Sequence, residues 1–214
     1  MNAQRAGPAR NRVTPRGDIV AVPARGAWMG NRGRLHKGDG RRDVFRDHQT
    51  KAWLVCTLSF KDRHLSQWQP GHYTLLFFLD EAVAFAAGHR PCAECRRADY
   101  NAYRSGWAAS HDGRPLLARE MDERLHRERR PATAVSRPVS AMDWRDLPDG
   151  VFVVAEERDA VVVGDHLAVW NGMDYAYGRH LPRPRGGVAR VLTPPSTTGV
   201  LRSGYPVQID ESAR

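Results

Sequence analysis

The sequence DEAVAFAAGHRPCAECRR, residues 80–97, has the pattern of a short helix that leads into a metal-binding turn. Asp80 is a residue type that caps helix N-termini, and the alanine-rich run after it favours helix. Gly88 can adopt the left-handed conformation that ends a helix and turns the chain. The turn then delivers Cys92 and Cys95, whose spacing allows both thiolates to bind one tetrahedral ion. No other stretch links residue spacing to chemistry so directly.

Charge is the second strong feature of the sequence. Its 214 residues carry a formal net charge of +9, with a sequence pI of about 10.1. Basic surface attracts the phosphate backbone whatever the base sequence, so we expect nucleic acid, DNA before RNA, as the partner. Nearly all of the positive charge is arginine, because lysine occurs only at Lys37, Lys51 and Lys61. A GC-rich coding sequence would produce the same bias without selection for binding, and this alternative stays open.

Cysteine usage and hydropathy indicate a cytoplasmic protein. The chain has three cysteines, and an odd number argues against a disulfide scaffold. The N-terminal residues lack the apolar core of a signal peptide. The longest apolar runs, such as residues 75–79 and 151–155, are far too short to span a bilayer, so we expect no membrane association.

Apolar patterning predicts the regular elements. We expect strands over residues 52–60 and 72–79 and amphipathic helices over residues 97–110 and 115–130. Residues 131–138 have the composition of a linker, and residues 178–187 are too rich in proline and arginine for regular structure. Further strands are expected at residues 18–22, 151–155, 160–163, 166–170 and 188–192, and a short helix ending at residue 202.

The cysteine turn and its surroundings resemble the metal-binding domain of the Ada family of DNA alkylation-repair proteins. They are more similar still to the small Ada-like modules found in nucleases and other bacterial proteins. In those modules a Gly-Asn pair and the first ligands precede an acidic-alanine helix and a final RPCxxC turn. The match covers at most about a third of the chain. The matching residues are Gly30, Asn31, His36, Glu81, Ala82, Ala87, Gly88, Arg90, Pro91, Cys92 and Cys95.

This resemblance implies a structural Cys₃His zinc site. His36 and Cys56 would form the first ligand pair, and Cys92 and Cys95 the second. Three thiolates and an imidazole suit zinc, and a closed four-ligand site is structural by default. The family has three residues between its first two ligands, whereas residues 37–55 separate His36 from Cys56 here. Alternatives to His36 therefore stay open, namely His48, His64 and His72.

Other readings of the cysteines also stay open. The remaining alternative for Cys92 and Cys95 is a redox dithiol, although the surrounding segment lacks the βαβ context that would support it. The alternative for Cys56 is a small buried hydrophobe in a strand. In Ada proteins a zinc-bound thiolate accepts the methyl group of a methylated DNA phosphate, but the accepting position corresponds to His36 here. We also expect a bulky phosphotriester to reach Cys56 poorly, so methyl transfer is not expected.

The implied domains follow from the resemblance and the turn signals. The expected fold class is α+β, with a basic flexible arm at residues 1–17 and an Ada-like zinc domain at residues 18–110. A helical linker at residues 111–148 would lead to a β-rich C-terminal section at residues 149–214.

Three functional hypotheses follow. The first is a zinc-stabilised, nucleic-acid-associated protein whose phosphate contacts, each with ordinary solvated surface as its alternative, are Arg90, Arg96, Arg97 and Arg104. The second is an enzyme acting on nucleic acid or a nucleotide, with its catalytic residues in the C-terminal section. Its candidate polar cluster is Asp174, Tyr175, Tyr177, Arg179 and His180. The third is a protein-interaction module without nucleic acid.

Overall fold

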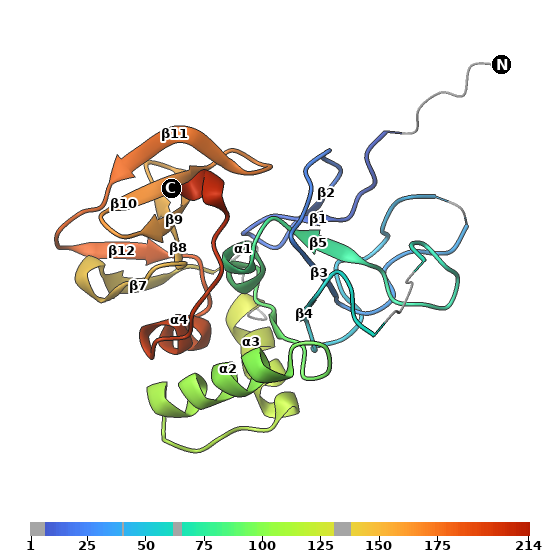
Figure 1. Cartoon of the computed structure of the whole chain (residues 1–214), viewed down its shortest axis with the longest axis horizontal. Helices are drawn as coiled ribbons and strands as arrows, with labels where there is room; N and C mark the ends of the chain where they lie inside the picture. The colour runs from blue at the N-terminus through green and yellow to red at the C-terminus, as the bar shows by residue number, and fades with distance from the viewer. Residues whose placement is uncertain (1–6, 40, 62–65, 131–137) are drawn as a thin grey trace.

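Two sheets and four α-helices make up the chain, as seen in a computed structural model that describes residues 7–39, 41–61, 66–130 and 138–214 (Figure 1). The N-terminal sheet has the strand order β2-β1-β5-β3-β4-β6, and the C-terminal sheet has the order β11-β10-β9-β8-β12-β7. Most strand pairs in both sheets are antiparallel. The α+β class expected from the sequence is confirmed.

The N-terminal sheet is built from very short strands. They are β1 (Arg12–Val13), β2 (Ile19–Val20), β3 (Trp28–Asn31), β4 (Leu54–Cys56), β5 (Leu76–Phe78) and β6 (Arg90–Pro91). The central strand, β3, pairs antiparallel with both β4 and β5, so that Met29 lies opposite Cys56 on one side and Phe77 on the other. The expected strands at residues 52–60 and 72–79 are therefore present but shorter.

Helix α1 (Glu81–Ala86) lies between the two sheets (Figure 1). It begins as predicted, because the Asp80 side chain accepts a hydrogen bond from the Val83 N–H at 2.7 Å. It is followed, as predicted, by Gly88 with a left-handed φ of +88°. Residues 82–87 are all fully buried. A helix that is apolar all round belongs inside a protein, and α1 accordingly joins the two sheets into one core.

Three further helices lie together on one side of the sheets (Figure 1). Helix α2 (Arg97–Ser110) spans the predicted residues and buries Tyr103 and Trp107. Helix α3 (Ala118–Arg129) buries Met121 and Leu125. Glycines allow α2 to approach α4 (Pro195–Arg202) closely, since a Cβ atom at residue 106 would lie 2.5 Å from the Ser203 Oγ.

The C-terminal sheet is the predicted antiparallel meander with additional strands at its edges. Its strands are β7 (Ser140–Asp143), β8 (Phe152–Ala155), β9 (Arg158–Val163), β10 (His166–Trp170), β11 (Tyr175–Pro182) and β12 (Val188–Val191). A short 3₁₀ helix lies between β7 and β8 at residues 144–146, and another lies near the C-terminus at residues 211–213. Residues 178–182 contradict the expectation of irregular structure, because they belong to β11. An edge strand tolerates proline, and Pro182 ends β11 opposite His166.

Contacts cross the domain boundaries that the sequence suggests. Residues 12–13 were expected in a flexible arm but form β1, where Val13 is buried and Arg16 reaches Asp159 of the C-terminal sheet at 2.7 Å. One hydrophobic core contains residues from both sheets and from α3, so it continues across residues 110 and 148. The expected linker at residues 131–138 lies almost wholly outside the described residues.

None of the helices in the described ranges is both long and apolar enough to cross a membrane.

Candidate metal centre

Strand register brings Cys56 and Cys92 together. Strand β6 pairs with β4 in parallel, so that Leu54 lies beside Arg90 and Val55 beside Pro91. The Cys92 N–H donates to the Val55 carbonyl oxygen at 3.0 Å, which extends this pairing by one step. Cys56 and Cys92 therefore occupy neighbouring positions at the ends of two adjacent strands, although 35 residues separate them in the sequence.

The turn after β6 adds the third cysteine. The Arg96 N–H donates to the Cys92 carbonyl oxygen at 3.1 Å, which closes the turn between β6 and α2. Within the turn the Glu94 N–H donates to the Cys92 sulfur at 3.4 Å. The Sγ atoms of Cys56, Cys92 and Cys95 all lie within 4.8 Å of one another. All three cysteines are free, Cys92 buried and the others half-buried.

This arrangement favours thiolate at Cys92. A hydrogen bond from the Cys56 thiol lowers the pKa of Cys92 to about 5, and backbone N–H groups of the turn act in the same direction. The same contact with Cys92, together with burial, raises the pKa of Cys56. Because only the thiolate ligates metal, a site that already stabilises one thiolate is chemically suited to a cation. The donor set fits a thiophilic ion such as zinc.

The structure does not bring His36 into this group. Its ring is fully engaged elsewhere, with Nδ1 2.8 Å from the Thr74 Oγ1 and Nε2 3.0 Å from the Gln69 carbonyl oxygen. The carbonyl oxygen can only accept, so Nε2 carries the proton and Nδ1 accepts from the Thr74 hydroxyl. The ring is 1 % exposed and packs edge-on against Trp68. The structure therefore does not place His36 with the cysteines; its ring holds the loop after β3 against the segment before β5.

The two described alternatives to His36, His48 and His72, also lie outside the cysteine group. His48 packs against the rings of Trp53 and His126, and His72 is exposed. His64 lies outside the described residues. Among the residues that the structure describes, no histidine, aspartate or glutamate joins the three cysteines.

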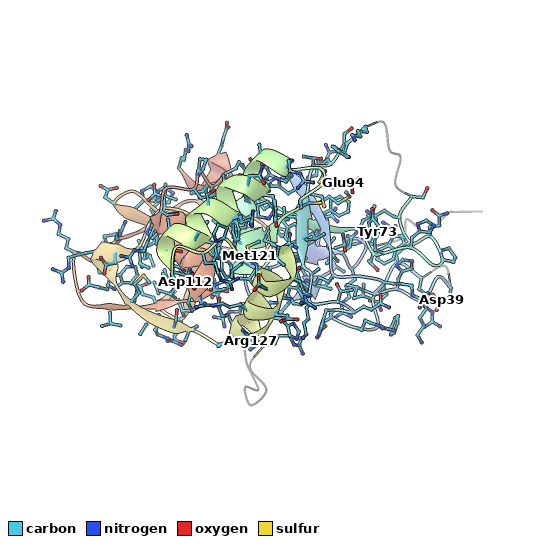
Figure 2. All side chains as sticks on the ribbon, turned by 90° about the horizontal axis from the view of Figure 1, so that it is seen from below. Asp39, Tyr73, Glu94, Asp112, Met121 and Arg127 are labelled. Atoms are coloured by element: carbon cyan, nitrogen blue, oxygen red, sulfur yellow. The ribbon has the colours of Figure 1, made fainter. Side chains whose placement is uncertain are left out.

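A cavity of about 200 Å³ opens beside the cysteines, and all three line it. Its wall includes the side chains of Leu54, Leu58 and Phe60. Together with Cys56, these are every second residue of the segment 54–60. Tyr73 and Glu94 lie on the same side of the molecule, next to the N-terminal sheet (Figure 2). Cys56 therefore borders an open cavity, although it belongs to an apolar strand.

The sequence interpretation missed the cavity wall, although one signal for it was present. Successive side chains of a strand point to opposite faces, so the strand expected over residues 52–60 would turn every second residue around Cys56 the same way. The apolar residues at positions 54, 58 and 60 follow this alternation. Tyr73 and Glu94 had no comparable signal, because their position depends on how separate loops fold.

Two of the four predicted phosphate-binding arginines are buried in ion pairs. Arg90 is 4 % exposed and binds both oxygens of Asp122 at 2.8 Å each. Arg96 is 5 % exposed, contacts Glu81 at 2.6 Å and stacks on Trp28. Both side chains are therefore structural, which corrects their expected role at a surface.

The other two arginines keep some access to solvent. Arg104 is half-buried, and its Nε donates to the Leu116 carbonyl oxygen at 2.6 Å. Arg97 is exposed at the start of α2, two residues after Cys95. Of the four, Arg97 is the residue whose placement fits a phosphate contact best.

The described members of the polar cluster predicted in the C-terminal section are not assembled into one site. Tyr175 is 1 % exposed, and its hydroxyl donates to Asp80 at 2.7 Å. Asp174 accepts a hydrogen bond from the Asn171 side chain within a turn, and His180 stacks on His166. The side chains of Tyr177 and Arg179 lie outside the described part of β11. The described members serve local structure, which gives the enzyme hypothesis no support from this segment.

Comparison of the chain with protein-family models, curated proteins and solved structures found no match in any of the three.

Proposed function

We propose that the protein binds one zinc ion through Cys56, Cys92 and Cys95. The observation that carries this proposal is the mutual approach of the three sulfur atoms within 4.8 Å. Two cysteines would suffice for a redox dithiol. A third thiol within the same distance supplies three of the four ligands of a thiolate-rich zinc site. When bound, zinc would supply a link between β4 and the turn before α2, in addition to the backbone hydrogen bond from Cys92 to Val55.

Thiol protection tests the zinc proposal. We expect iodoacetamide to alkylate the cysteines of the zinc-free protein and zinc to protect all three together. Mass spectrometry after alkylation in the presence and absence of a chelator measures this for each residue. Protection of Cys92 and Cys95 without Cys56 would contradict the three-cysteine centre.

We also propose that nucleic acid is the partner, with the exposed surface beside the metal centre as the contact. Arg97 supports this, since it is exposed and follows the cysteine turn directly. Helix α3 carries further exposed arginines, including Arg119, Arg124 and Arg127, although Figure 2 shows Arg127 well apart from Glu94 of the cysteine turn. Together with the net charge of +9, these residues supply the positive surface that phosphate contacts require.

A salt series tests the nucleic-acid proposal. The affinity for a labelled DNA duplex should fall as salt rises, because phosphate contacts release counterions. Arg97→Glu should weaken binding at every salt concentration and flatten the dependence. Arg158→Glu, which changes an exposed arginine of the C-terminal sheet, serves as the matched control. Affinity that does not depend on salt would contradict the proposal.

A further inference from the structure

The cavity beside the cysteines has an apolar wall. Met29, Leu54, Leu58, Phe60 and Tyr73 supply most of its surface, and they come from β3, β4 and the loops that follow β4 and precede β5. Leu58 is 54 % exposed and Tyr73 40 % exposed, so the cavity opens to solvent. An apolar hollow with a few polar groups beside it is the usual form of a small-molecule site.

The polar groups that line this cavity in the described part of the chain carry no positive charge. They belong to Asn31, Thr57, Glu94 and the cysteines, and the described lining includes no lysine, arginine or histidine. Lys61 lies over the Phe60 ring, with its Nζ 5.1 Å from the ring centroid, but it does not line the cavity. A divalent ion bound by three thiolates leaves one net negative charge at the centre. An anionic ligand would therefore meet repulsion here.

The coordination of a thiolate-bound zinc needs one more donor than these cysteines supply. Zinc in proteins is almost always four-coordinate, and an open fourth position is the mark of a site that takes water or a substrate. Among the described residues, no carboxylate or imidazole joins the three sulfur atoms. All three cysteines line the same cavity, so a ligand in the cavity would be next to the ion.

We propose that this cavity binds a neutral nitrogen heterocycle, which donates its ring nitrogen to the fourth position of the zinc centre. The inference rests on the zinc site proposed above. A neutral donor adds no charge to an anionic centre, its nitrogen is a type of ligand that zinc accepts, and its ring contacts Phe60, Tyr73 and the aliphatic side chains. Cavities of about 150 Å³ hold benzene, so one of about 200 Å³ has room for a small ring system.

Cobalt substitution tests this inference on the full-length protein. The visible d–d bands of bound Co²⁺ report its coordination, and the probe is benzimidazole, a neutral heterocycle with a basic ring nitrogen. We expect benzimidazole to shift these bands and to saturate. Indole, which has the same size but no available ring lone pair, should leave them unchanged, and benzoate should bind more weakly than benzimidazole.

A pair of surface variants tests the role of the cavity wall. Leu58→Glu places a carboxylate at the rim and should weaken benzimidazole binding by about tenfold or more while Co²⁺ stays bound. Val188→Glu makes the same kind of change at a residue that is 72 % exposed and remote from the cavity, and it should bind the probe like wild type. Equal weakening by both variants would overturn the assignment to this cavity.

The outcomes separate this inference from the zinc proposal. Failure to bind Co²⁺ would overturn both. Stoichiometric Co²⁺ with bands that benzimidazole does not move would overturn this inference alone, because the fourth position would then be filled by the protein. Adenosine and a single-stranded oligoadenylate, titrated in the same way, identify the source of the ligand. A shift with the oligonucleotide assigns a base of nucleic acid, and a shift with the free compounds alone assigns a small molecule.

Discussion

Two adjacent carboxylates at the start of α1 connect distant parts of the protein. Asp80 accepts hydrogen bonds from the Tyr175 hydroxyl and from the Asp210 N–H. Glu81 binds Arg96 and accepts a hydrogen bond from the Tyr205 hydroxyl at 2.8 Å. Both carboxylates are at most 2 % exposed, so each depends on these partners. The pair that marks the helix start in the sequence thus also joins the C-terminal residues to the core.

Asp80 should make stability depend on pH. Burial raises the pKa of its carboxyl group to about 6, so the folded chain binds this proton more tightly than the unfolded chain does. The unfolding free energy should therefore fall as pH rises from about 4 to about 6, by about 3 kcal/mol from this group, and level off above that. Asp80→Asn cannot titrate and should lack this fall. Denaturant unfolding of both proteins across this range measures the difference.

The control for Asp80 is Asp165→Asn, which changes a fully exposed carboxylate. Its pH profile should run parallel to that of wild type. If the profile of Asp80→Asn also runs parallel to wild type, the carboxyl of Asp80 does not titrate as its burial requires.

Arg90 should act on stability rather than on binding. Arg90→Met leaves Asp122 buried without its cation, which should lower the unfolding free energy by about 3–5 kcal/mol. Arg97→Met changes an exposed side chain and should stay within about 0.5 kcal/mol of wild type. Adding Asp122→Leu to Arg90→Met should recover much of the loss. Equal stability of the two arginine variants, measured by urea unfolding, would refute the structural role of Arg90.

At the scale of elements, the cysteine site depends on a strand pairing that local sequence does not encode. The caps of α1 and the extent of α2 follow from residues within each helix and were predicted correctly. The parallel contact of β6 with β4 was not, because β6 is only two residues long and its residues pair with positions far earlier in the chain, Arg90 with Leu54 and Pro91 with Val55. His36 was misassigned for a related reason, since its partner Thr74 lies 38 residues away.

At Gly30, the backbone of β3 leaves no room for a side chain beside β4. A Cβ atom at this position would lie 2.1 Å from the Leu54 carbonyl oxygen and 2.8 Å from the Phe78 ring. To make room for the added methyl group, the backbone of β4 would have to shift, which would disturb the register that positions Cys56. Gly30→Ala should therefore lower the unfolding free energy by about 1–3 kcal/mol or more.

Gly30→Ala should also weaken zinc binding, because β4 carries Cys56. The matched control is Gly186→Ala, where an added Cβ would meet open space. Calorimetric unfolding and a competitive zinc titration measure the two effects. A Gly30→Ala protein as stable as the control would be inconsistent with this strand packing.

At the scale of the whole molecule, one core replaces the two domains that composition suggested. The boundary expected near residue 148 coincides with a change from helices to strands along the chain, since most of the C-terminal sheet lies beyond it. Composition cannot show, however, that α1 inserts between the sheets or that Met121 and Leu125 of α3 are fully buried in the same core. Those are long-range contacts, which the sequence pattern of a single element does not specify.

A single core predicts a single unfolding transition. Tryptophans occur in both halves of the chain, among them Trp53 and Trp170, so fluorescence reports on both sheets. For the zinc-loaded protein, fluorescence and far-ultraviolet circular dichroism should give superimposable urea curves. Two separated transitions would show that the halves unfold independently, contrary to the shared core.

The measurement that tests the central claim most directly is the zinc content of the purified protein and its single-residue variants. Wild type should retain one zinc ion per chain, and Cys56→Ala, Cys92→Ala and Cys95→Ala should each lose it. His36→Ala should retain zinc, because both ring nitrogens of His36 are engaged away from the cysteines. Stoichiometric zinc in Cys92→Ala, or loss of zinc in a folded His36→Ala protein, would contradict a centre built on the three cysteines.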